Sequence, residues 1–222
     1  MARTVTRSDI RSKIRLKADR PSTVRPTNAN LDDLIDGAWT HLWDLLVEAE
    51  PERYVKQADI TVTASTRSYN LPSDFKVCMG VAVQDNDMPD GYSILERYNW
   101  DERYDYTYAQ QKEWTRYHIQ YGKIWFHPTP SWSGTVRIEY VPYAEEWDDS
   151  TNIDTVNGWD EWIVYQVCAD LLGLDKEDPS YFLAKKQEVE NRILKSVALD
   201  VGKPKTVVDY RRSSKKYPGW GW

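Results

Sequence analysis

The clearest hydrophobic pattern in the chain is a helical stripe between Asn30 and Pro51. Steps of three and four residues place its apolar positions on one face of an α-helix; these positions are Leu31, Leu34, Ile35, Ala38, Leu42, Leu45, Leu46 and Ala49. Asn30 is the expected N-cap, and Pro51 is the expected end. Trp39 and Trp43 lie one turn apart on a flank of this helix. We expect both tryptophans to belong to the core.

A second helix is predicted over Asn157–Leu174, and its apolar residues surround almost the whole helix. They are Trp162, Ile163, Val164, Tyr165, Val167, Cys168, Ala169, Leu171 and Leu172. A soluble helix of this kind has to be enclosed by other elements. Asn157 is the expected N-cap, and Gly173 is the expected stop. We therefore expect this helix to be the centre of a helical layer.

Two further helices are predicted near the ends of the chain. Thr6, with Asp9 three residues later, is a capping-box variant that opens a helix to about Ala18. Asp178-Pro179 is typical of a helix start, and the helix runs from there to about Asp200. Its apolar stripe is Phe182, Val189, Ile193, Val197 and Val201. The sequence thus predicts a helical bundle of about four helices.

Between residues 58 and 142 the period of the hydrophobic pattern changes to two, which is typical of strands. The alternating groups are Ile60 and Val62; Val77, Met79, Val81 and Val83; Ile124 and Phe126; and Val136, Ile138 and Tyr140. Gly80 can mark a bulge. Alternation on one side favours an antiparallel sheet or a small sandwich over a parallel sheet. Residues 97–114 are expected to form a short helix and an extended loop.

These patterns predict an α+β fold: a helical bundle of about four helices with an inserted antiparallel β domain and an extended C-terminal tail. The expected boundaries are 1–57 for the N-terminal helices, 58–142 for the β domain, 143–201 for the C-terminal helices and 202–222 for the tail. No apolar signal region and no run of membrane-spanning length is present. Synthesis in the cytosol is expected.

Charge is distributed unevenly along the chain, although the net charge is only -6. Residues 1–25 hold eight basic and two acidic residues, a net of +6, and residues 203–222 hold six basic and one acidic, a net of +5. The middle therefore carries -17. Basic ends on an acidic body suit contact with an acidic partner or nucleic acid. Simple solvated arms are an equal alternative.

The C-terminal tail combines basic and aromatic residues without any periodicity. We expect it to bind a partner through Lys203, Lys205, Tyr210, Arg211, Arg212, Lys215, Lys216, Tyr217, Trp220 and Trp222. Exposed tryptophans are typical anchors that fill pockets on another protein. The alternative is a frayed terminus.

No constellation in the sequence indicates catalysis or a cofactor. His41, His118 and His127 are scattered and have no metal-ligand spacing. Cys78 and Cys168 form neither a disulfide framework nor a metal motif, although a bond between them stays open. Phosphate-loop, dinucleotide and nucleophile-elbow motifs are absent. The acidic group at Glu145, Glu146, Asp148 and Asp149 is expected to be a solvated turn. We predict a protein that is not an enzyme and holds no metal.

Several short motifs carry a family resemblance. They are the helix with Asn30-Leu31 and Leu34-Ile35-Asp36, the segment Tyr69-Asn-Leu71-Pro72-Ser-Asp74-Phe75, then Ile124-Trp-Phe-His-Pro128-Thr-Pro130, then Thr135-Val-Arg-Ile-Glu-Tyr140, followed by two helices and a tail. Over roughly residues 28–210 the chain resembles the head-to-tail connector proteins of tailed bacteriophages, also called portal adaptors or tail accessory factors.

The resemblance implies a structural virion protein of the phage neck. It implies a dodecameric ring under the portal protein, a tail that grips the portal, and a helical layer that lines the DNA channel. The β domain would face outward or toward a downstream tail or nozzle protein. DNA would pass without sequence-specific binding, and an acidic body suits this because like charge repels the phosphates. The alternative is a carbohydrate-binding tail or surface protein that uses Trp100, Trp114, Trp125 and Trp132.

Overall fold

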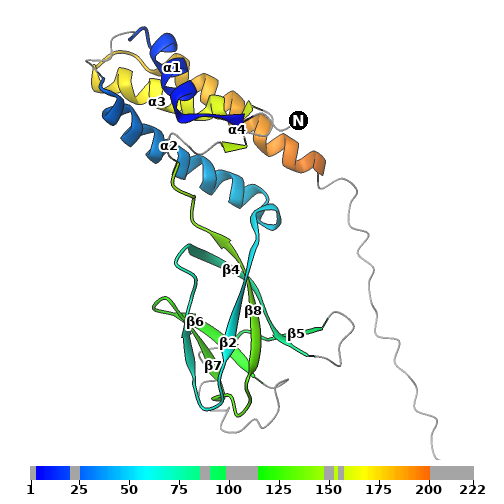
Figure 1. The fold of residues 1–222 in the computed structure, drawn as a ribbon. Coiled ribbons are helices and arrows are strands. Elements are labelled where there is room, and N and C mark those ends of the chain that lie inside the picture. The colour runs from blue at the N-terminus through cyan, green and yellow to red at the C-terminus, as the bar shows by residue number, and fades with distance from the viewer. Residues whose placement is uncertain are drawn as a thin grey trace, which may run out of the picture.

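The computed structural model describes residues 4–20, 26–85, 91–98, 115–147, 153–154 and 158–200. Within them the chain has an α+β fold with four α-helices and three sheets whose strands pair antiparallel. Figure 1 shows the helices packed together and most of the strands beneath them. In chain order, strands β2 to β8 fall between the second and third helices. None of the described helices is long and apolar enough to cross a membrane.

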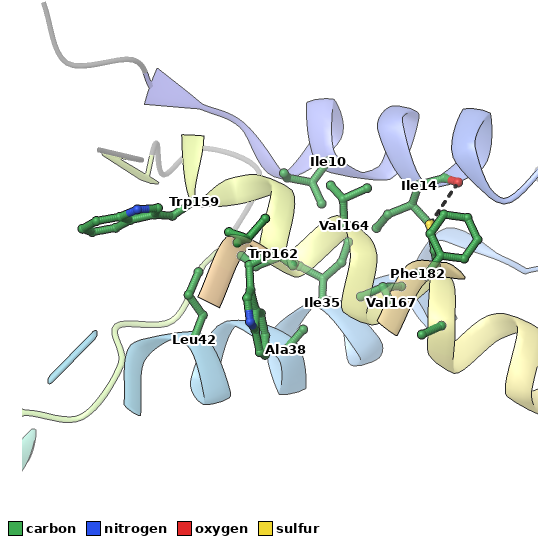
Figure 2. Packing of buried hydrophobic residues seen from close by; sticks show 14 of the residues in the cluster. Ile10, Ile14, Ile35, Ala38, Leu42, Trp159, Trp162, Val164, Val167 and Phe182 are labelled. Atoms are coloured by element: carbon green, nitrogen blue, oxygen red, sulfur yellow. Dashed lines mark hydrogen bonds between the residues drawn. The ribbon is translucent and has the colours of Figure 1, made fainter. Parts of the chain in front are cut away.

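The helical layer is built around the third helix. The helices are α1 (Arg7–Lys17), α2 (Asn28–Ala49), α3 (Asp160–Leu174) and α4 (Ser180–Asp200). Helix α3 packs against all three others, as its encircling apolar residues predict. Figure 2 shows side chains of α1 and α2 meeting α3 from opposite sides. The shared core includes Ile10, Ile14, Leu31, Ile35, Leu42, Trp162, Ile163, Val167, Cys168, Phe182, Val189 and Ile193.

The N-caps of the first two helices are capping boxes. At α1, Thr6 and Asp9 form the predicted box, since each side chain accepts from the other residue's backbone N–H. At α2 the N-cap is Thr27, and Asn30 is its partner three residues later. The prediction of Asn30 as the N-cap is therefore wrong. Thr27 begins the helix because its hydroxyl satisfies the Asn30 amide, which would otherwise lack an acceptor.

Helix α3 begins later than predicted, and Gly173 is not its stop. Its N-cap is Trp159, which makes no side-chain capping bond, and Asn157 lies outside the described residues. At the other end the helix continues past Gly173 to Leu174. Lys176 then adopts a φ of 60°, and its N–H donates to Gly173 O while that of Glu177 donates to Leu172 O. This is a Schellman ending with a lysine where glycine is usual.

The strands form two sheets that share one core. One sheet has the order β2-β8-β4-β5, with β2 (Lys56–Val62), β8 (Gly134–Pro142), β4 (Phe75–Gln84) and β5 (Tyr92–Ile94). The other has the order β3-β7-β6, with β3 (Ser68–Asn70), β7 (Lys123–His127) and β6 (Arg116–Gln120). Their common core includes Val62, Val81, Val83, Tyr117, Ile124, Phe126, Val136, Ile138 and Tyr140. The arrangement is the small sandwich that the alternation predicts.

Strand β4 departs from simple alternation. Its register against β8 shifts between Phe75 and Val77 and again between Cys78 and Gly80. The second shift leaves Met79 as an extra residue, and an extra residue turns all following side chains to the other face. Val81 and Val83 are therefore buried, whereas Val77 and Met79 are exposed. The predicted bulge near Gly80 is confirmed.

A 3₁₀-helix and a separate pair of short strands complete the described fold. A 3₁₀-helix, η1 (Pro51–Tyr54), links α2 to β2. The two-residue strand β1 (Thr4–Val5) pairs with β9 (Ile153–Asp154). This pairing ties the start of the chain to the segment that leads into α3. The region predicted as a helix and loop, residues 97–114, lies mostly outside the described residues.

Candidate partner-binding surfaces

The predicted tail site lies outside the described residues. This applies to every residue assigned to it: Lys203, Lys205, Tyr210, Arg211, Arg212, Lys215, Lys216, Tyr217, Trp220 and Trp222. Helix α4 extends to Asp200 and leads directly into this segment. The tail assignment therefore stays a prediction from its sequence.

The basic residues near the start of the chain bind inside the protein. Arg7 lies 2.6 Å from Asp36 and 3.2 Å from Asp32, and Arg11 forms two hydrogen bonds to Asp32. Lys13 Nζ lies 2.5 Å from a carboxylate oxygen of Asp160. Farther along, Arg20 pairs with Asp175 and Glu177. These residues are neither solvated arms nor a free basic patch, because they fasten α1 to α2 and α3.

The ion pair of Lys13 and Asp160 contains a buried carboxylate. Asp160 is fully buried at the first residue of α3. A carboxylate in that position needs a compensating charge, since burial removes its hydration. The N-terminus of the helix also favours negative charge there. The ion pair holds α1 across the start of α3, and the helix terminus stabilises the same carboxylate.

An aromatic row covers the flank of α2 at the junction with the sheets. It consists of Trp147, Trp39, Trp43 and Tyr54, with successive ring centroids 6.1, 5.8 and 4.8 Å apart. Trp39 Nε1 donates to the carbonyl of Glu145, and Trp43 Nε1 donates to that of Pro142. Trp39 and Trp43 are half-buried and hold the chain leaving β8. Trp39 packs against the helical core, as predicted, whereas Trp43 lies outside the described core cluster.

Ion pairs reinforce the same junction. Lys56, at the start of β2, lies 2.6 Å from Glu145, and Lys76 of β4 pairs with Asp44 of α2. Exposed pairs of this kind contribute little each, about 0–1 kcal/mol. Together with the aromatic row they orient the sheets against α2.

A cleft of about 300 Å³ opens beside the aromatic row. We call it the junction cleft; it is lined by Arg7, Asp36, Trp39, Thr40, Ala144, Glu145, Glu146 and Trp147. The indoles give it an apolar floor and three carboxylates give it an acidic rim. Glu145 and Glu146, expected in a solvated turn, are exposed, but residues of α2 and Arg7 line the cleft beside them.

The structure brings two of the three histidines together. The rings of His118 on β6 and His127 on β7 lie 5.1 Å apart, and Tyr98 stacks on His127 at 4.5 Å. His41 is exposed on α2. In the described part of the chain no group of three or more His, Cys, Asp or Glu side chains is placed to hold a metal ion. The antiparallel pairing of β6 with β7, which the Tyr121-Gly122 turn signals, was the available hint of this proximity.

His127 is held in its neutral form. Burial, assisted by the positive charge of Arg67 and by His118, lowers its pKa to about 4. Arg67 Nη2 lies 2.6 Å from Nδ1 of this ring, and a guanidinium can only donate there if the ring nitrogen is unprotonated.

This burial predicts a loss of stability on acidification. The unfolded chain takes up a proton on His127 near its ordinary pKa of 6.5, whereas the folded protein does so only near 4. The contribution of neutral His127 to the free energy of unfolding is therefore fully present above pH 6.5. It is lost as the pH falls to about 4, and the loss is at most about 3 kcal/mol. Urea unfolding of wild type and His127→Gln across this range measures the difference. Parallel pH curves for the two proteins would contradict it.

Both cysteines are free thiols in separate cores. Cys168 is buried in the helical core, where its Sγ lies 3.9 Å from the Ile14 carbonyl, the contact drawn dashed in Figure 2. Burial raises its pKa to about 12. Burial also raises the pKa of Cys78. A disulfide between them is absent, and neither thiol has the low pKa of a reactive cysteine.

The tryptophans proposed as a sugar platform are only partly described. Trp125 stacks with His118 at 6.1 Å, and Trp132 packs against the sheet core and donates to Thr115. Both are half-buried. Trp100 and Trp114 lie outside the described residues. Nothing in the described residues favours a planar row of exposed rings.

Exposed large apolar side chains occur both in the helices and in the β region, where Ile94 is 86% exposed. Leu16 of α1 is 83% exposed and Leu174, the last residue of α3, is 72% exposed. On α4, Tyr181, Leu183 and Leu194 are exposed. Where such side chains adjoin one another, they are typical of surfaces that meet other proteins.

Comparison with known families identifies the class of protein. The model of the SU10 adaptor protein family matches residues 5–200, which include all four helices and both larger sheets. The chain belongs to this family, a family of phage head-to-tail adaptors, in agreement with the resemblance in the sequence. A search of curated proteins gave no match. Membership implies a place in the virion neck and contact with other phage head or tail proteins. It also suggests a structural role rather than catalysis.

Proposed function

We propose that the protein is the head-to-tail adaptor of its phage, and that copies of it form a ring beneath the portal protein. The observation that carries the proposal is the family match, which spans the helical layer and the sheets together. The exposed leucines on α1, α3 and α4 support it, because ring closure requires each copy to bury surface against two neighbours. The ring is proposed to be dodecameric and to continue the DNA channel toward a downstream tail protein.

The functional division follows the four segments of the chain. Residues 1–57 and 143–201 form the helical layer, 58–142 form an inserted β domain, and 202–222 form the portal-binding tail. The separate hydrophobic cores of the helices and the sheets support the first two boundaries. The basic and aromatic composition of residues 203–222 supports the last. The acidic remainder of the chain suits a channel wall that DNA must pass without adhering.

Co-expression with the portal protein tests the proposal. Native mass spectrometry and electron microscopy of the purified complex should show a closed ring of adaptor copies on one face of the portal. The portal expressed alone is the control for its own symmetry. Adaptor that stays monomeric in the presence of the portal would overturn the proposal.

A further inference from the structure

The junction cleft can hold part of another chain segment. Its volume of about 300 Å³ lies at the low end for ligand pockets, which leaves room for one or two side chains. Trp39 is half-buried and offers part of its ring to the cleft, with Trp147 buried behind it. Indole faces attract lysine and arginine. The floor of the cleft therefore suits a cationic side chain with an apolar stem.

The rim of the cleft holds three carboxylates, of which Glu146 differs from the other two in its contacts. Asp36 is paired with Arg7 and Glu145 is paired with Lys56. Glu146 is exposed, and among the described residues it makes no ion pair. A positively charged segment is the complement of this rim.

We propose that the junction cleft binds the basic C-terminal segment of the same chain before the portal is met. Residues 203–222 carry a net charge of +5, with the adjacent pairs Arg211-Arg212 and Lys215-Lys216. These pairs place a cation on Trp39 and a second one against Glu146. The cleft and the portal then compete for one segment, so that the tail is held on the body until the portal displaces it.

The length of the segment permits this contact. The 22 residues that follow Asp200 span up to about 70 Å when extended. Helix α2, the longest helix, has 22 residues and is about 33 Å long. The tether therefore reaches any point on the helical layer, including the cleft beside the middle of α2.

The expected contact is weak enough to be reversible. Exposed ion pairs and exposed cation–aromatic contacts are each modest. A flexible tether, however, gives an effective concentration in the millimolar range, so that a contact with a millimolar dissociation constant is substantially occupied. The contact should weaken with salt, because the Debye length falls to about 3 Å near 1 M.

Photo-cross-linking in the full-length free protein tests this inference. With p-benzoylphenylalanine in place of Tyr217, cross-links should map within one chain to the segments around Trp39 and Glu146. Glu146→Lys should lower their yield roughly tenfold, as should salt near 1 M. Combining Glu146→Lys with Lys215→Glu and Lys216→Glu should restore it. Glu52→Lys, at an exposed acid on η1, is the matched control and should leave the yield unchanged.

Three results would overturn the inference: cross-links that avoid the cleft, a yield that Glu146→Lys does not change, and cross-links between chains whose yield rises with concentration. The portal is absent from this experiment. Its failure would therefore leave the proposed ring untouched, and failure of the ring would leave the cleft contact untouched.

Discussion

Leu42→Ala should lower the free energy of unfolding by about 2–5 kcal/mol, the range for truncating a buried leucine to alanine. Leu42 is 1% exposed in the helical core, on the face of α2 that meets α3 in Figure 2. Removing its branched end leaves a cavity between two helices that the rest of the core holds in place. Equilibrium unfolding in urea measures the loss.

Leu16→Ala is the matched control for this substitution. Leu16 has the same side chain but is 83% exposed at the end of α1. Its truncation should change the unfolding free energy by at most about 0.5 kcal/mol. Equal effects of the two substitutions would mean that the apolar stripe of α2 is not the core face.

Truncation of the chain after Val201 should abolish attachment to the portal while leaving the stability nearly unchanged. The truncation removes the aromatic anchors and the +5 segment together. It keeps α4 and both described cores, whose last member is Ile193. Co-sedimentation with purified portal measures attachment, and thermal unfolding measures stability.

Two partial variants separate the contributions of the tail. Trp220→Ala with Trp222→Ala should speed dissociation from the portal even at low salt, because pocket-filling aromatics act on the off-rate. Charge reversal at Lys215 and Lys216 should mainly slow association and should matter less as salt rises. Truncated protein that joins portals as well as the full-length chain does would show that the tail is not the anchor.

The elements with strong periodicity were predictable from the sequence. The stripe of α2, the encircling apolar surface of α3 and the alternation in β7 and β8 match burial in the structure, as do Phe182, Val189 and Ile193 of the α4 stripe. Each of these signals repeats over several turns or residue pairs, so that a single exception does not hide it. The class of fold follows from where the period changes.

Features set by single residues were missed or misplaced. The extra residue at Met79 puts Val81 on the opposite face from Val77, although the sequence places the two in step. Strand β9 is two residues long, too short to show alternation. Thr27 and Asn30 can each cap a helix, and only the backbone decides which one does.

The candidate surfaces depend on contacts between distant segments. The junction cleft joins Arg7, α2 and the chain after β8, and Lys13 meets Asp160 across 147 positions. No local pattern links such residues. The ion pairs of the basic residues near the chain start were therefore not predictable. The same holds for the backbone carbonyls, about 100 positions away, that accept from Trp39 and Trp43.

The order of the elements also governs what happens on the ribosome. The apolar stripe of α2 is complete by Ala49, but α3, which covers it, begins at Asp160. At about 5–20 residues per second, roughly 5–20 s separate the two. The strands from β2 to β8 are all made during that interval, so the sandwich can fold first. The helical layer then closes last, and until then its leucines are open to chaperones and to other nascent chains.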